Sequence, residues 1–136
     1  MQGLALHYYL ESIKYNSEEE KNSARKLLKS KYGNLFGRVK IEGIINKAEE
    51  FITDNPEIFS KKYQVFNEYL LKEKTENGEN YYRIDRMLVD RDKKIIKIID
   101  YKSGSYRDPA QLEKYKELLQ QKLNSSWQID TEFLSI

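Results

Sequence analysis

The apolar run 95–99 constrains the fold most, because it leads directly into Asp100, Tyr101 and Lys102 and ends at Gly104. Such a run predicts a β-strand, and alternate side chains of a strand point to the same face. Asp100 and Lys102 therefore share a face, and Tyr101 points to the other. At a strand end, the carboxylate of Asp100 can bind a divalent cation, and the ammonium group of Lys102 beside it can contact a phosphate. For the tripeptide alone, a surface ion pair is the better interpretation.

The composition predicts one domain spanning residues 1–136, large enough to bury a core without disulfides. Hydrophobic residues make up 39% and charged residues 34% of the chain, so its surface is heavily charged and no apolar run is long enough to cross a membrane. The chain has no cysteine, which excludes thiolate metal sites and a cysteine nucleophile. No signal-peptide pattern occurs in residues 1–10, so we expect a cytoplasmic protein without a membrane partner.

The net charge does not by itself indicate a nucleic-acid-binding protein. The chain carries 24 basic and 22 acidic residues, for a net charge of +2. A binding surface for nucleic acid would therefore have to come from an uneven distribution of charge.

Helical patterns dominate the first half of the chain. Ser17 and Glu20 form a capping-box signal, Gly33 and Gly37 mark the end of the helix that it opens, and Asp108-Pro109 starts a later helix. The expected helices cover residues 3–15, 18–31, 41–53 and 109–123.

The second half reads as strands separated by turns. A hairpin turn is expected at residues 76–79 and another at 91–94. The expected strands cover residues 63–73, 80–90, 94–102 and 127–135. The predicted fold is α+β, with a mixed, mostly antiparallel sheet flanked by helices.

The expected turns predict which acids meet. A turn centred between Asp92 and Lys93 sets Asp85 opposite Asp100. A turn centred on residues 77–78 sets Glu68 opposite Met87, on the same face as Asp85. We therefore expect Glu68, Asp85, Asp100 and Lys102 on one face, provided that no bulge changes the register.

Clustered carboxylates repel one another unless a cation neutralises them. With oxygen ligands and no thiolates, Mg²⁺ or Mn²⁺ is the expected metal. Alternatively, each acid pairs with a neighbouring base, for which Arg83, Arg86 and Lys97 are available.

Two further positions lie near this motif. Gln111 and Tyr115 are spaced i,i+4 on the helix that follows it, so either side chain can face the site, or Tyr115 can be a core residue and Gln111 a capping residue. His7, the only histidine, lies beside an apolar helix face and by itself indicates a partly buried core residue.

The chain resembles a known family in five segments, which occur in this order: Gly3-Leu-Ala-Leu-His7, Glu68, Ile84-Asp85-Arg86, residues 99–104 and Gln111–Tyr115. The family that it resembles is the RecB/AddA-like branch of the PD-(D/E)XK nucleases. The family's nuclease domains lie at the C-terminus of UvrD-like helicases. The resemblance covers nearly the whole chain and is weakest over residues 16–60. Tyr82 stands where the family often has Gly, and Ser103 where Thr is commoner.

The resemblance implies a restriction-endonuclease-like core and a Mg²⁺- or Mn²⁺-dependent DNase. His7, Asp85, Asp100 and the Tyr101 carbonyl would be metal ligands. Lys102 would act on the attacking water and the phosphate.

The remaining matched positions have supporting roles in the family. Glu68 would be a further catalytic acid, and Gln111 and Tyr115 would support the site or contact DNA. DNA and a helicase motor, in the same polypeptide or complex, are the implied partners. The alternatives are a nuclease-fold DNA-binding or scaffolding module without activity, and a protein-interaction domain with solvated acids.

Overall fold

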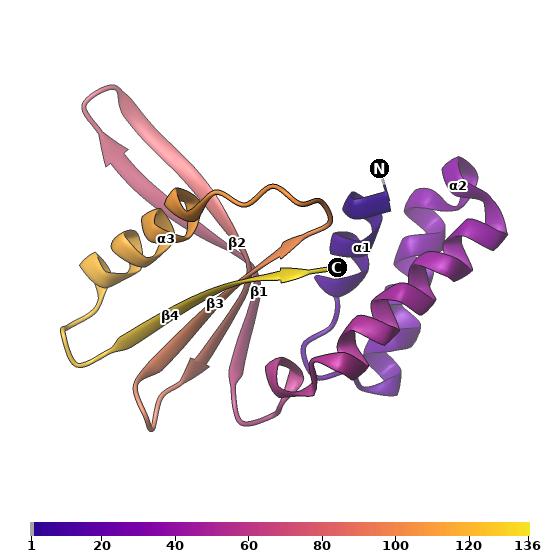
Figure 1. The fold of residues 1–136 in the computed structure, drawn as a ribbon, viewed down its shortest axis with the longest axis horizontal. Helices are drawn as coiled ribbons and strands as arrows, with labels where there is room; N and C mark the ends of the chain where they lie inside the picture. Colours follow the sequence, from indigo (N-terminus) through magenta and orange to yellow (C-terminus); the bar gives the residue numbers. More distant parts are fainter. Residues whose placement is uncertain (1) are drawn as a thin grey trace. The chain divides into compact units, whose positions relative to one another are not determined.

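The computed structural model describes residues 2–136, which form two compact units. Unit 1 extends to Lys61 and includes Ile136, and unit 2 covers Lys62–Ser135. Figure 1 shows helices alone in unit 1 and a sheet with one helix in unit 2. The α+β class is therefore confirmed, while the prediction of a single domain stays a prediction.

Helix α1 spans Gln2–Leu10 and is shorter than the predicted helix 3–15. The chain leaves the helix because the carboxylate of Glu20 accepts hydrogen bonds from the backbone N–H groups of Lys14 (2.7 Å), Tyr15 (3.1 Å) and Ser17 (2.9 Å). Asn16 has a positive φ of 58°, which reverses the chain inside this loop. The sequence pattern shows the apolar stripe but not the competing acceptor.

Helix α2 spans Glu18–Asp54, where the sequence predicts two separate helices. Ser17 caps it with the predicted capping box. At Gly37 the backbone leaves helical geometry (φ 77°, ψ 168°), so α2 consists of two helical arms, and the chain turns back between them (Figure 1). Ion pairs join the arms: Arg25 to Glu49, and Lys29 to Glu42 at 3.4 Å. A short 3₁₀ helix, η1 (Pro56–Phe59), ends unit 1 and was not predicted.

Unit 2 is a four-stranded sheet with the strand order β1-β2-β3-β4. The first three strands are antiparallel, and β4 pairs parallel to β3 after the crossover helix α3, as the predicted mixed sheet requires. The elements are β1 (Gln64–Thr75), β2 (Gly78–Asp90), β3 (Ile95–Lys102), α3 (Pro109–Lys122) and β4 (Gln128–Ser135). Each lies within about two residues of its predicted range.

One predicted register is confirmed and the other is wrong by two residues. Between β2 and β3, Arg86 pairs with Ile99, which is the predicted alignment. Between β1 and β2, Thr75 pairs with Gly78, so the turn residues are 76–77 instead of 77–78. Gly78 has φ 132° and opens β2 instead of occupying the turn.

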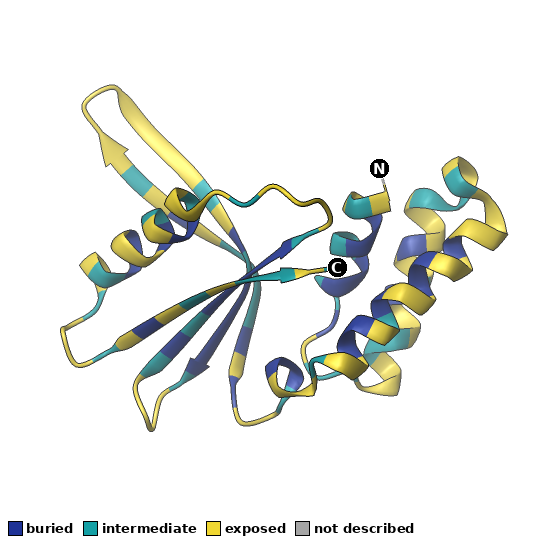
Figure 2. Ribbon diagram, in the orientation of Figure 1, coloured by how far each residue is buried: buried dark blue, intermediate teal, exposed yellow. Residues whose placement is uncertain are grey.

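The core of unit 2 lies between the sheet and α3. Figure 2 shows the buried positions on the strands and on the inner side of α3. Residues of α3 in this core are Leu112, Tyr115, Leu118 and Leu119. Asp108 caps the helix, because its carboxylate accepts from the backbone N–H of Ala110 at 3.1 Å. Capping and packing together fix the start of α3 beside the end of β3.

Candidate active site

Strands β2 and β3 separate at the predicted pair of aspartates. The backbone ladder runs from Asp90–Ile95 to Arg86–Ile99, and the same alignment sets Asp85 opposite Asp100. There a side chain replaces the backbone as the hydrogen-bond acceptor: Oδ2 of Asp85 accepts from the N–H of Tyr101 at 2.8 Å. Asp85 is therefore fixed against the end of β3.

The corrected turn places Glu68 differently from the prediction. The pairs Asn67–Arg86 and Tyr69–Ile84 set Glu68 opposite Asp85, and not opposite Met87. Glu68 has a positive φ of 53°, which interrupts the regular pleat at this point.

The alternation of buried residues changes at the same place. Both Met87 and Ile84 belong to the core that packs on α3, although three positions along a regular strand would put them on opposite faces. Phe66 and Tyr69, their partners on β1, both pack against that core too. At Glu68 and Asp85, the β1–β2 hairpin therefore changes which of its faces packs against α3.

Asp100 is a buried acid, with only 3% of its surface exposed. The pKa of Asp100 is raised to about 6: burial is the largest cause, the contact with Lys102 opposes it, and the charge of the neighbouring Asp85 adds to the rise. The two aspartates are therefore close enough to interact electrostatically.

Lys102 connects the aspartates to α3. Its Nζ lies 2.9 Å from Oδ2 of Asp100 and donates a hydrogen bond to Oε1 of Gln111 at 3.0 Å. The same Nζ lies 5.7 Å from the centre of the Phe133 ring. The ammonium group is thus held in one place by contacts from β3, α3 and β4 of unit 2.

Gln111 and Tyr115 extend this connection along α3. Nε2 of Gln111 donates to the hydroxyl of Tyr115 at 3.0 Å, and that hydroxyl donates to the backbone carbonyl of Arg83 at 3.3 Å. Tyr115 is thus both a core residue and part of the polar site, so the two alternatives for it were not exclusive.

The three acids also act together on Tyr115. Burial raises the pKa of its hydroxyl, the hydrogen bond with Gln111 opposes that shift, and the charges of Asp100, Asp85 and Glu68 add to the rise. The predicted convergence of acids and Lys102 therefore has a geometric counterpart within unit 2.

The alternative of simple ion pairing applies to Asp100, which pairs with Lys102. The fully buried Arg86 donates from Nη1 to Oδ1 of Asn67 at 3.1 Å. Lys97 lies over the ring of Tyr63, at 5.6 Å from its centre.

The carboxylates of Asp85 and Asp100 and the carbonyl of Tyr101 suit a hard divalent cation, because all are oxygen donors. No group of three His, Cys, Asp or Glu side chains arranged to hold a metal occurs within residues 2–136. His7 lies on α1, in unit 1, and its role as a ligand stays a prediction.

A loop feature beside the motif was not predicted. Arg107 donates to Oγ of Ser135 at 2.7 Å and lies 6.0 Å from the centre of the Phe133 ring. This contact secures the loop 103–108, whose Tyr106 is 77% exposed. No local sequence signal indicates this contact, because Arg107 and Ser135 are 28 residues apart in the chain.

Comparison of the chain with protein-family models, with curated proteins and with solved structures found no match. In residues 2–136, no helix is both long enough and apolar enough to cross a membrane.

Proposed function

We propose that the chain is a Mg²⁺- or Mn²⁺-dependent deoxyribonuclease with a PD-(D/E)XK-like active site in a restriction-endonuclease-like core. One observation supports this most: Asp85 is bonded to the backbone of β3 beside Asp100, and Asp100 is in contact with Lys102. Two acids and one lysine at a strand end are the arrangement that the motif order implies.

In this proposal Asp85, Asp100 and the Tyr101 carbonyl would hold the cation, and His7 would be the further ligand that the resemblance implies. When bound, the cation would neutralise charge on the scissile phosphate and make a water molecule more acidic. Glu68 lies opposite Asp85 in the strand register and is the additional acid. The oxygen donors are consistent with Mg²⁺ or Mn²⁺.

Lys102 has the central catalytic role among the protein groups. Its ammonium group orients the attacking water and stabilises the negative charge that develops on the phosphate. Gln111 fixes that group in place, and Tyr115 in turn fixes Gln111. Water attacks phosphorus, and the bond to the leaving sugar oxygen breaks, so the phosphodiester is hydrolysed.

DNA is the proposed substrate. A helicase motor in the same polypeptide or complex is the proposed partner, as in the family that the motifs resemble. Exonuclease activity in DNA repair and recombination follows from the same resemblance.

A second candidate function is a nuclease-fold module that binds DNA without cleaving it. One observation favours it: no group of three His, Cys, Asp or Glu side chains arranged to hold a metal occurs within residues 2–136. Such a module would bind DNA equally well with and without divalent cations.

The deciding experiment is cleavage of labelled single- and double-stranded DNA with Mg²⁺, with Mn²⁺ or with EDTA. We expect cleavage only with a metal, and its loss in Asp100→Asn and Lys102→Ala. Lys116→Ala is the matched control, because this lysine is exposed on α3. Full activity of either site variant contradicts the mechanism, and metal-independent binding without any cleavage supports the second candidate.

A further inference from the structure

The basic residues of the chain are unevenly distributed along the sequence. Residues 21–40 contain seven Lys and Arg and no Asp or Glu. All 22 acidic residues lie outside this segment, where they outnumber the 17 other basic residues. The rest of the chain is therefore net acidic, and one segment of 20 residues carries the excess of positive charge.

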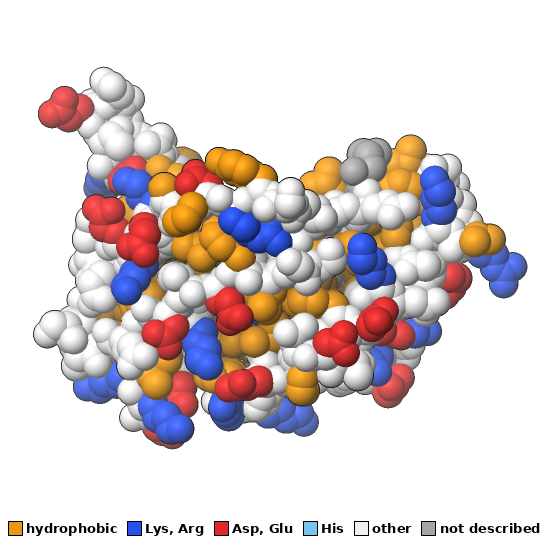
Figure 3. Space-filling view, in the orientation of Figure 1, with side chains coloured by type: hydrophobic (Ala, Val, Ile, Leu, Met, Phe, Trp, Pro, Cys, Tyr) orange, Lys and Arg blue, Asp and Glu red, His pale blue; other side chains and the backbone are white. Residues whose placement is uncertain are grey.

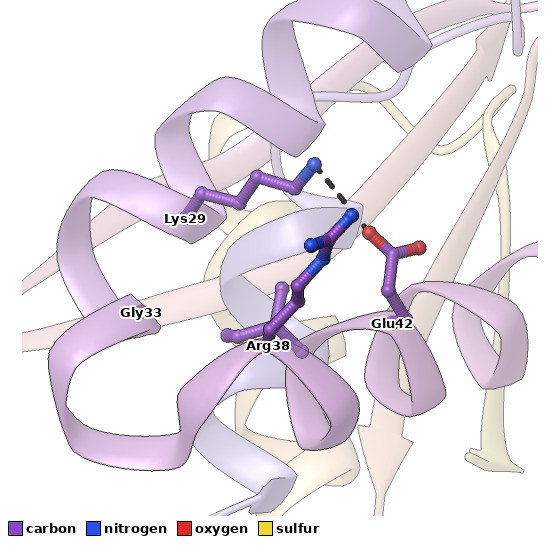
Figure 4. Close-up of a pocket in the computed structure, with 5 residues that line it drawn as sticks. Lys29, Gly33, Arg38 and Glu42 are labelled. Carbon is purple, nitrogen blue, oxygen red and sulfur yellow. Dashed lines mark ion pairs between the residues drawn. The ribbon is translucent and has the colours of Figure 1, made fainter.

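This segment, which we call the hairpin tip (residues 21–40), comprises most of the first arm of α2, the turn at Gly37 and the first residues of the second arm. The chain reverses at Gly37, so Arg38 and Lys40 at the start of the second arm follow the five cations of the first arm. Figure 4 shows Lys29 from the first arm and Arg38 from the second, both pointing toward Glu42. Together with Gly33 and Ile41 they line a pocket of about 400 Å³.

Only part of this charge is neutralised. Ion pairs engage Lys21 with Glu18, Arg25 with Glu49 and Lys29 with Glu42. Four cations have no carboxylate partner among residues 2–136: Lys26, Lys31, Arg38 and Lys40. All four are exposed, so they are available to an external anion.

The part of Figure 3 that lies over the sheet and α3 of unit 2 gives a contrast. There, Asp and Glu side chains are interspersed with Lys and Arg side chains. Mixed charges of this kind produce little net attraction for a polyanion. A run of cations without acids produces a local positive field, which attracts a polyanion.

Aromatic rings at the hairpin tip position one of these cations. Nζ of Lys31 lies 4.3 Å from the centre of the Tyr8 ring and 5.7 Å from that of Tyr32. Tyr32 in turn stacks on Phe36, with ring centres 5.7 Å apart. Lys31 is therefore held by its neighbours within unit 1 while its charge stays exposed.

We infer that the hairpin tip is a second DNA-binding surface, which contacts the phosphate backbone through Lys26, Lys31, Arg38 and Lys40. This inference extends the proposed function, because the residues assigned to phosphodiester cleavage, apart from His7, all belong to unit 2. Contacts between lysine or arginine and phosphate are independent of sequence and strongly salt-dependent. The tip therefore supplies general affinity for DNA and no base specificity.

An anionic lipid surface is the competing partner, since apolar side chains are also exposed at the tip: Leu27, Leu35 and Val39. The proposed cleavage of DNA in unit 2 of the same chain favours DNA as the partner of these cations. The test includes vesicles, so that the two partners give different results.

The experiment measures binding of the full chain to fluorescein-labelled duplex DNA in EDTA, over a range of NaCl concentrations. The tip variant carries Lys26→Gln, Lys31→Gln, Arg38→Gln and Lys40→Gln. The control variant removes the same charge from exposed lysines of unit 2, through Lys74→Gln, Lys93→Gln, Lys116→Gln and Lys122→Gln.

We expect the tip variant to bind DNA about tenfold or more weakly at low salt, and the slope of log affinity against log salt to fall by about 4. The control variant should change the slope by less than half of that. Equal losses in both variants overturn the inference, because they indicate net charge alone. Unchanged DNA binding together with lost binding to phosphatidylserine vesicles overturns it in favour of the lipid.

A folding defect is recognised by circular dichroism and melting of each variant. If the tip variant does not fold, the double variant Lys26→Gln, Lys40→Gln should give about half the slope change, and no change overturns the inference. Cleavage with Mg²⁺ separates the two proposals. If the wild type cleaves DNA and the tip variant binds DNA normally, only the DNA-binding role of the tip is rejected. If the tip variant loses DNA binding and the wild type does not cleave, only the nuclease function is rejected.

Discussion

Lys102 and Asp100 form an ion pair of 2.9 Å on one face of β3, yet the pKa of Asp100 is still raised to about 6. The lysine offsets only part of the cost of burying the carboxylate and placing it beside Asp85. With Asp100 ionised, the chain therefore has a lower free energy of unfolding than it would have with a proton or another cation bound to Asp100. This relationship leads to the first two predictions.

Replacing Asp100 with Asn should stabilise the metal-free chain. The raised pKa corresponds to about 3 kcal/mol of unfavourable free energy in the ionised form, from roughly 1.4 kcal/mol per pKa unit. We expect urea denaturation at pH 8 in EDTA to show a free energy of unfolding about 1–3 kcal/mol higher for Asp100→Asn. Asp130→Asn, an exposed position on β4, should change it by less than about 0.5 kcal/mol. Lower stability of Asp100→Asn would contradict the electrostatic interpretation.

The same group gives a defined pH dependence. Because the folded pKa of Asp100 lies above its ordinary value of 3.8, the folded chain binds more protons than the unfolded chain between about pH 4 and pH 6. Stability from this group is therefore lost as the pH rises through that window. In EDTA, the difference in free energy of unfolding between wild type and Asp100→Asn should grow from pH 4 to pH 7. A constant difference over this range would rule out titration of Asp100.

Tyr115→Phe removes the hydroxyl that accepts from Gln111 and donates to the carbonyl of Arg83. Gln111 then loses the contact that orients it toward Lys102. We expect the cleavage rate to fall several-fold, DNA affinity to stay within twofold, and stability to fall by about 1 kcal/mol. Tyr81→Phe is the control, because Tyr81 is 56% exposed near the hairpin turn. Equal activity of both variants would show that the hydroxyl does not position Lys102.

Glu20 stabilises the loop between α1 and α2. Although burial acts to raise its pKa, hydrogen bonds from Ser17, Lys14 and Tyr15 hold the pKa below its usual value. Its contribution is therefore present above the ordinary pKa of glutamate and is lost as the pH falls through its folded pKa. Glu20→Ala should lower the free energy of unfolding by about 1–3 kcal/mol at pH 7. Glu19→Ala, an exposed neighbour, should change it by less than about 0.5 kcal/mol.

Much of unit 2 could be predicted because its signals are local. The turn at residues 91–94 fixed the alignment of Asp85 with Asp100, and Asp108-Pro109 located the start of α3. The turn after β1 was misplaced by one residue, and the register therefore by two, because Gly78 suggests a turn position, whereas the structure uses it to open β2. A shift of two residues leaves each side chain on the same face of the sheet, so the acids were still predicted to lie together.

The remaining features depend on contacts that spacing does not encode. The face switch at Glu68 and Asp85 depends on a local backbone conformation within two paired strands. The early end of α1 depends on an acceptor supplied by another helix, Glu20. The two arms of α2 were predicted as separate helices because Gly33 and Gly37 both signal an end, and only Gly37 leaves helical geometry.

The hydrogen bond from the Tyr101 backbone N–H to the carboxylate of Asp85 makes this amide a spectroscopic probe. Its proton chemical shift depends on the charge of the acceptor, so in a ¹⁵N-labelled sample the Tyr101 resonance should follow protonation of the aspartates or addition of Mg²⁺. Binding at the site can thus be read from one backbone signal, without substrate and without altering any side chain.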